Sequence, residues 1–156
     1  KPTDLAAIQK LPDVAAQLLR QAGFKVDLQA MDWQTLVGRR AKKDAPEKGG
    51  WHMFTTAWTA QDVWSPIGNP TMDSRGEKST WFGWATDEKL AELRNQFMRA
   101  TDEPTKKKLA DQMHARAFEV GTHAVLGEYT QPMAARKNIS GFFITNSNLY
   151  WNLKKN

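Results

Sequence analysis

The 156 residues suit one globular domain, because 40% of them are apolar and seven tryptophans can contribute to a core. The chain has no cysteine, which excludes disulfides, Cys-ligated zinc and thiol catalysis, and no apolar run approaches the ~20 residues of a membrane span. The net charge of +5 comes from lysine-rich stretches near acids, so solvated helix faces explain it better than a nucleic-acid partner does.

The first half of the chain predicts alternating helices and strands. Apolar residues at helical spacing predict a helix over 12–22, and alternating apolar and polar residues predict a strand over 24–30 with one buried face. Asp32 can cap a second helix over 33–43, and "WHMFTTAW" at 51–58 predicts another buried strand. This order predicts parallel strands joined by a right-handed crossover, with helices covering the sheet.

The second half begins with a long irregular segment over 59–83, which is rich in proline and glycine and has no sustained period. Such loops are usually functional or mobile. Thr86 can cap an amphipathic helix, and "TDEP" at 101–104 starts a second one. Short strands are predicted over 123–130, 133–144 and 148–155. With no repeat and no domain boundary, the whole chain, 1–156, is expected to form one α/β domain.

The sequence offers no candidate for catalysis, a metal or a cofactor. The histidines lack a ligand spacing such as HExxH, the serines lack a GxSxG elbow, and no glycine-rich turn has a phosphate-loop pattern. Paired acids at 87–88 and 102–103 lie at predicted helix starts, where negative charge complements the helix dipole.

The tryptophan distribution is the feature that most suggests a binding site. Five of the seven fall within 34 residues: Trp51, Trp58, Trp64, Trp81 and Trp84. Aromatic side chains on loops suit ligand clefts, because each offers a large apolar area and tryptophan keeps a polar N–H. Trp51 and Trp58 lie on a predicted buried strand and are expected in the core, whereas Trp64, Trp81 and Trp84 suit either packing or ligand contact. Asp62 could pair with a cationic ligand group or serve as an ordinary turn residue.

An ordered series of stretches resembles the C-terminal part of the family 5 extracellular solute-binding proteins of ABC transporters, which include dipeptide-, oligopeptide- and nickel-binding proteins. The stretches cover nearly the whole chain: "VAAQLLRQAGFKVDLQAMDWQTLVGRRAKK" at 14–43, "KGGWHMFTTAW" at 48–58, "WFGWATDEKLAELR" at 81–94, and "LGEYTQPMAARKNISGF" with "YWNLKKN" near the end.

The resemblance implies that the chain forms most of the second lobe of a type II periplasmic-binding-protein-like fold, with a mixed sheet flanked by helices. It also implies that the chain ends at the native C-terminus. Full-length members close two lobes on a ligand in the periplasm, or tethered outside the membrane, and deliver it to a membrane permease without catalysis. The implied partners are therefore a peptide or peptide-like ligand, the permease and the missing N-terminal lobe, with no cofactor, no nucleic acid and membrane contact only through the transporter.

The resemblance also implies a role for Asp62. In the peptide-binding branch, an aspartate in the loop after the "TAW" strand anchors the ligand's α-ammonium, and Asp62 is the nearest match. That branch shows Trp-x-x-Asp followed by Asp-Pro, whereas this chain has Trp58-Thr-Ala-Gln-Asp62 and Ser65 before Pro66. Asp62, Trp58 and Trp64 are expected to line the cleft. The alternative is a stand-alone carbohydrate-binding module that stacks sugars on surface tryptophans.

Overall fold

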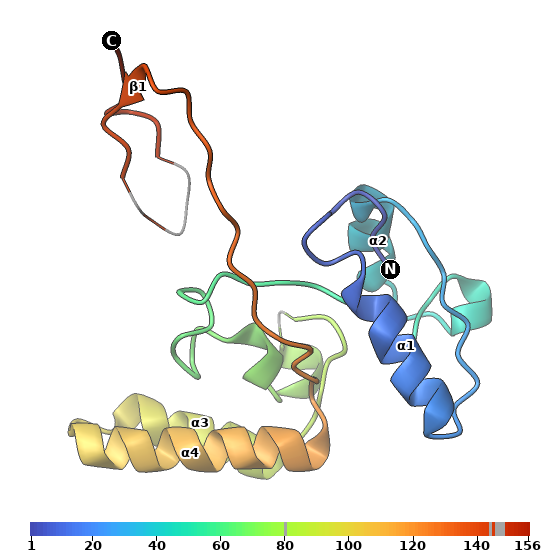
Figure 1. Ribbon diagram of the computed structural model, residues 1–156. Coiled ribbons are helices and arrows are strands. Elements are labelled where there is room, and N and C mark those ends of the chain that lie inside the picture. Colours follow the sequence, from blue (N-terminus) through green and yellow to red (C-terminus); the bar gives the residue numbers. More distant parts are fainter. Residues whose placement is uncertain (80, 144, 146–148) are drawn as a thin grey trace.

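The computed structural model describes residues 1–79, 81–143, 145 and 149–156. Figure 1 shows two helical parts and a C-terminal segment that runs away from both. The first part holds α1 (Leu11–Gln21) and α2 (Trp33–Arg40), and the second holds α3 (Glu88–Arg99) and α4 (Glu103–Val120). Short 3-10 turns occur at Pro46–Lys48, Pro70–Met72 and Gly76–Lys78.

The four predicted helices are confirmed, with small corrections at their ends. Pro12 lies in the first turn of α1, as its missing N–H requires. The Asp32 carboxylate accepts a hydrogen bond from the Thr35 backbone N–H at 2.9 Å and caps α2, which ends at Arg40 rather than at residue 43. The prediction that Thr86 caps α3 is wrong, because the N-cap is the next residue, Asp87.

The predicted strands over 24–30 and 51–58 are wrong, since neither forms a ladder with another described segment. The first segment leads into one isolated parallel bridge, Pro2 to Met31, where the Met31 N–H donates to the Lys1 carbonyl at 3.0 Å. Alternating side chains suit a pleat, but a strand also needs a neighbour for its backbone groups. The predicted crossover between parallel strands is therefore not formed.

The C-terminal strand prediction is confirmed only at two short pieces. β1 (Ile139–Ser140) and β2 (Lys154–Lys155) pair antiparallel, and 123–130 forms no strand. Ile144 and Asn148, at the ends of predicted strands, lie outside the described residues. Within the described ranges the chain is thus a small mixed helix-and-sheet domain, compatible with the α/β class but without the larger mixed sheet.

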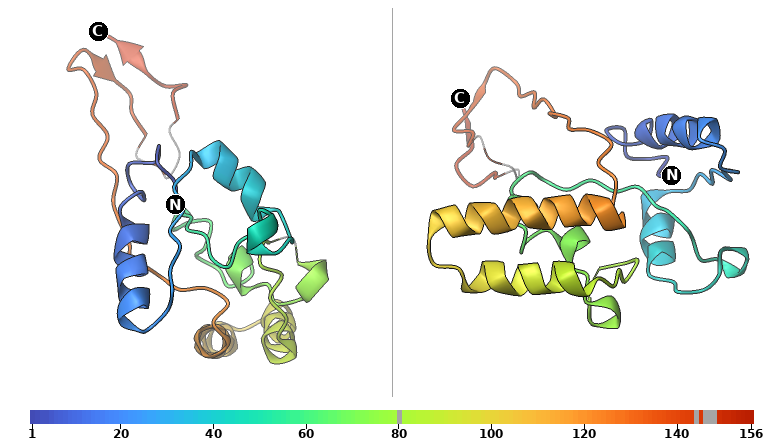
Figure 2. Two further views of the ribbon diagram at one scale, coloured as in Figure 1. Left: turned by 90° about the vertical axis from the view of Figure 1, so that its right-hand side faces the viewer. Right: turned by 90° about the horizontal axis from the view of Figure 1, so that it is seen from below.

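The hydrophobic core lies between α3, α4 and the turn at Pro70–Met72. Figure 2 shows the two helices side by side, and they bury one cluster of apolar residues. Its buried members are Met72, Leu90, Met113 and Ala117, with Leu93 and Phe97 packed against them. The tryptophans contribute little to this core, because every one of them is half-buried or exposed.

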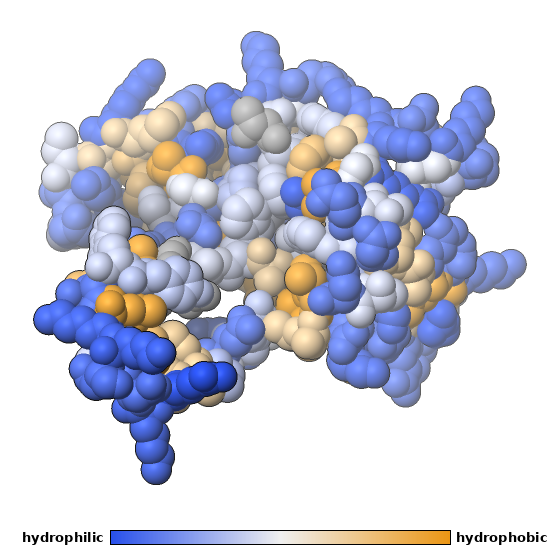
Figure 3. All heavy atoms as spheres, turned by 90° about the horizontal axis from the view of Figure 1, so that it is seen from above, coloured by the Kyte–Doolittle hydropathy of each residue, from blue (hydrophilic) through white to orange (hydrophobic). Residues whose placement is uncertain are grey.

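Apolar side chains also reach the surface in several separate areas among hydrophilic ones (Figure 3). They come from both helical parts and from the C-terminal segment: Val14, Leu18, Phe24, Trp64, Phe118, Val125, Tyr150 and Trp151 are each more than half exposed. None of the helices in the described part of the chain combines the length and the apolar character that crossing a membrane requires.

Asp87 joins the long loop to both core helices. Its carboxylate accepts the Leu90 backbone N–H at 2.7 Å and pairs with the Arg116 guanidinium of α4 at 2.5 Å. Its backbone N–H donates to the Ser74 carbonyl at 3.0 Å, and the Ser74 hydroxyl donates to its carbonyl at 2.9 Å. The Arg116 hydrogen bond lowers the pKa of Asp87 below its ordinary value.

Replacing Asp87 with asparagine should destabilise the protein by about 1–2 kcal/mol, because the amide keeps the cap but leaves Arg116 without this charged partner. Urea denaturation measures the loss. Asp102→Asn is the matched control, since Asp102 caps α4 through the Thr105 N–H and makes no ion pair among the described residues. Equal losses from the two substitutions would contradict the role given to the ion pair.

The same pair predicts a pH dependence. Because the pKa of Asp87 is lower in the folded protein than in the unfolded chain, its stabilising contribution is complete above the unfolded value and is lost as pH falls through the folded one. Urea denaturation repeated between about pH 5 and pH 2 should show a smaller decrease in unfolding free energy for Asp87→Asn than for wild type. Parallel pH curves would rule out this contribution.

Candidate functional site

A cluster of aromatic side chains brings together two segments about 25 residues apart in sequence. The Trp81 ring centroid lies 4.9 Å from that of Trp58, 5.1 Å from Phe82 and 6.2 Å from Phe54. Trp51 packs edge-on against Phe54 at 4.7 Å. Such tilted and edge-on pairs are the preferred geometries for aromatic rings. We call this set the aromatic cluster: Trp51, Phe54, Trp58, Trp81, Phe82 and Trp84.

The turn that carries half of the cluster holds Trp84 in a strained backbone conformation. Trp84 has φ 45°, and it is the one described residue other than glycine with positive φ. Gly83 before it has φ 98°, and the Gly76 N–H donates to the Ala85 carbonyl at 2.9 Å, which fixes the far side of the turn. Bulky side chains rarely adopt this region, and such strain often marks functional sites.

Two cations from the end of α2 and the residues after it lie over the cluster. The guanidinium carbon of Arg40 is 4.7 Å from the centroid of Phe82 and 5.3 Å from that of Trp81, and the ammonium of Lys43 is 4.5 Å from that of Trp84. These distances fall within the range of cation–π attraction. Burial lowers the pKa of Arg40 below its ordinary value.

The cluster contains some of the residues predicted to contact ligand and leaves others out. Trp58, Trp81 and Trp84 belong to it, while Trp64 is 86% exposed and makes no ring contact with another described aromatic. Asp62 is also exposed and closes a turn: its carboxylate accepts the Thr59 hydroxyl at 2.7 Å. The structure therefore separates Asp62 and Trp64 from the other three.

The expectation that Trp51 and Trp58 lie in the core is wrong. Trp51 is half-buried and packs against Phe54, and Trp58 is 40% exposed and packs against Trp81. Both rings therefore keep contact with solvent. The Trp51 indole N–H donates to the Arg40 carbonyl at 3.1 Å, which ties the cluster to the end of α2. A half-exposed group of rings offers apolar area to a ligand, which a closed core does not.

The sequence pattern did not indicate the cationic half of this site. The run "RRAKK" indicated a solvated helix face, but Arg40 turns toward the rings, and its neighbour Arg39 turns toward the following loop. Phe54 and Phe82 were missed as well, although the dense aromatic run "WFGW" at 81–84 was a usable signal. Spacing alone does not say which of two adjacent arginines meets an aromatic surface.

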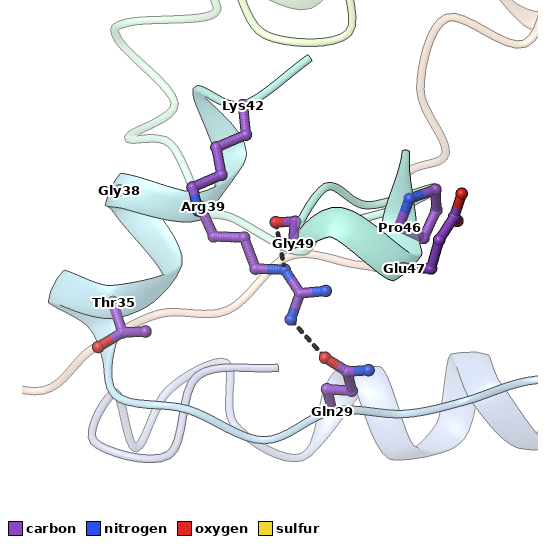
Figure 4. A pocket seen from close by; sticks show the side chains of 8 residues that line it. All are labelled: Gln29, Thr35, Gly38, Arg39, Lys42, Pro46, Glu47 and Gly49. Carbon is purple, nitrogen blue, oxygen red and sulfur yellow. Dashed lines mark hydrogen bonds between the residues drawn. The ribbon is translucent and has the colours of Figure 1, made fainter. Parts of the chain in front are cut away.

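Two open hollows of about 600 Å³ each lie elsewhere on the described surface. Figure 4 shows the first, where Arg39 points at the Gly49 carbonyl and at the Gln29 side chain. Arg39 also donates to the Gly50 carbonyl at 2.8 Å. Its guanidinium is therefore hydrogen-bonded to the loop after α2. The second hollow lies where α3 turns into α4, and neither hollow includes a member of the aromatic cluster.

The chemistry available at the cluster is that of binding. Ring faces, indole N–H groups and two cations can hold a solute with apolar and negatively charged parts. No group of three or more His, Cys, Asp or Glu side chains in the described ranges is placed to hold a metal ion.

Trp81→Ala should lower the unfolding free energy by about 1–3 kcal/mol, because the ring contacts Phe54, Trp58, Phe82 and the Arg40 guanidinium. Trp64→Ala removes an equally large ring that is 86% exposed, so it should change stability little. Urea denaturation of both variants tests the packing of the cluster. If Trp64→Ala costs as much as Trp81→Ala, the rings are not packed as described.

No family model matches the chain. Its sequence is 29% identical over 153 residues to the probable peptide ABC transporter periplasmic-binding protein of Sinorhizobium fredii, and the similarity covers 98% of the chain. The chain spans 29% of the length of that relative. The similarity therefore covers nearly all of this chain but less than a third of that protein, whose name describes a binding component of peptide transport.

Proposed function

We propose that this chain is a ligand-binding lobe of an ABC importer's solute-binding protein, and that its aromatic cluster contacts a peptide or peptide-like solute. The observation that carries the proposal is the similarity over 98% of the chain to a peptide transporter's periplasmic-binding protein. Because the chain corresponds to 29% of that relative's length, we further propose that the rest of the binding protein supplies the opposing lobe.

The form of the cluster supports this role. Trp58 is 40% exposed while its ring lies 4.9 Å from Trp81, so it is both supported from behind and open to a ligand. Ligand sites combine such apolar area with a few directed polar groups. A cleft that closes over these rings would remove water from them, which strengthens both apolar and charged contacts.

Asp62 and Trp64 form a second, outer part of the proposed site. Both side chains reach solvent on the loop that follows the 51–58 segment, and Asp62 is oriented by the Thr59 hydroxyl. An exposed carboxylate gains little from a cation in open water, but more inside a closed cleft. In this proposal Asp62 contacts a cationic group of the solute only after the lobes close.

The remaining parts of the proposal follow from membership of an import system. We place the protein in the periplasm, or tethered outside the membrane, with delivery of the solute to permease subunits. The relative's name supports transport by a binding protein and does not favour a stand-alone carbohydrate-binding module.

The decisive test is a thermal-shift screen of the full-length protein with dipeptides, oligopeptides, glutathione, haem and nickel chelates. A cognate solute at 100 times its Kd should stabilise the folded state by about 2.7 kcal/mol, which raises the melting temperature measurably. The full-length protein is needed, because a lobe supplying half of a micromolar binding energy would bind only at about millimolar Kd. Failure of every solute to raise the melting temperature would remove the peptide-like assignment.

Once a solute is found, calorimetry of Trp58→Ala should show an affinity at least tenfold lower, about 1.4 kcal/mol, because the exposed ring face is lost. Trp151→Ala is the matched control, since Trp151 is 82% exposed and lies outside the cluster. Asp62→Asn should lower the affinity only for solutes that carry a cationic amine. Unchanged affinity in Trp58→Ala would exclude the cluster as the contact surface.

A further inference from the structure

Arg40 is the last residue of α2, and its guanidinium is surrounded by rings. Its central carbon lies 5.5 Å from the Trp33 centroid, 5.3 Å from that of Trp81 and 4.7 Å from that of Phe82. The Nε atom is buried and has no hydrogen-bond partner in the described part of the chain. The side chain as a whole is half-buried, so part of the guanidinium still reaches solvent.

The other half-buried arginines of the described chain are all engaged with protein groups. Arg39 donates to backbone carbonyls of the following loop, and Arg116 pairs with Asp87. Arg94 donates to the Ile67 carbonyl at 3.2 Å through Nη2, although its buried Nη1 has no partner among the described residues. Arg40 differs, because no carboxylate or carbonyl among the described residues accepts from it. A cation taken partly out of water without an anion is unfavourable, and ring faces compensate for only part of that loss.

The neighbouring cation Lys43 differs from Arg40 in having a carboxylate partner. Lys43 lies over the Trp84 ring and pairs with Glu77, whereas Arg40 pairs with no carboxylate in the described part of the chain. The buried hydroxyl of Thr55, next in the chain to Phe54, likewise has no partner among the described residues. Arg40, a cation without an anionic partner, thus lies against the aromatic cluster, whose turn holds Trp84 under backbone strain.

We propose that Arg40 binds a carboxylate group of the solute, with the surrounding rings holding the guanidinium in place. The guanidinium presents N–H groups in a fixed fork that matches the two oxygens of a carboxylate. The aromatic cluster beside it contacts the apolar part of the same solute. This assignment rests on the proposed role in solute binding, but it names the ligand's chemistry at one side chain and does not require the solute to be a peptide.

The test uses benzoate as the probe, because it joins a planar carboxylate to an apolar ring, and benzamide as its neutral counterpart. Calorimetry and tryptophan fluorescence of the full-length protein are followed at constant ionic strength. Benzoate should bind saturably at Arg40 with at least tenfold higher affinity than benzamide. Arg40→Gln should abolish that preference, and Lys42→Gln should leave it intact, since it removes the same charge two residues away.

Arg40→Lys is a conservative control, because it keeps a cation near the rings. The urea midpoint of every variant shows whether a loss of binding comes from a loss of folding. Lysine lacks the fork, so benzoate affinity should fall severalfold without loss of the fold.

Equal binding of benzoate and benzamide, absence of saturable benzoate binding, or an unchanged preference in Arg40→Gln would overturn the proposal. Tighter binding of inorganic phosphate than of benzoate would overturn the choice of carboxylate. Benzoate binding at Arg40 in a protein that no peptide stabilises would leave this inference standing and reject only the peptide cargo.

Discussion

The ion pair between Asp87 and Arg116 is the interaction on which the arrangement of the second half depends. The Asp87 carboxylate caps the first turn of α3 and pairs with Arg116 of α4. The Asp87 backbone makes two hydrogen bonds with Ser74 of the long loop. The turn carrying Trp81, Phe82 and Trp84 lies between Ser74 and Asp87 in sequence. Because both ends of that turn are tied to the core helices, the rings are presented by a supported loop rather than by a free one.

The aromatic cluster then connects this helical pair to the N-terminal part. The Trp51 indole N–H donates to the Arg40 carbonyl at the end of α2, and the Arg40 guanidinium lies over the rings of Trp81 and Phe82. The contact is therefore made of aromatic and cationic groups, with little of the aliphatic packing found between α3 and α4. Such a contact can serve packing and recognition at once, since rings and guanidinium remain half-exposed.

Local signals in the sequence were sufficient for the helices and insufficient for the strands. Asp32 and Asp102 cap helices because a carboxylate needs only the amides of the next turn, which the sequence itself supplies. The segments 24–30 and 51–58 have suitable side chains, yet a strand depends on a partner distant in sequence, and no described segment provides one. The site shows the same division. Trp58, Trp81 and Trp84 could be selected from composition, whereas the approach of Arg40 depends on how α2 meets the loop.

In the proposed complex, the solute lies against the aromatic cluster with its carboxylate at Arg40. An experimental structure of the full-length protein with its bound solute tests this most directly. Apolar solute atoms are expected within about 4.5 Å of the Trp58 or Trp81 ring. A carboxylate of the solute is expected within about 3.2 Å of the Arg40 guanidinium nitrogens. A solute held away from these rings, with Arg40 paired instead to a side chain of the protein, would contradict it.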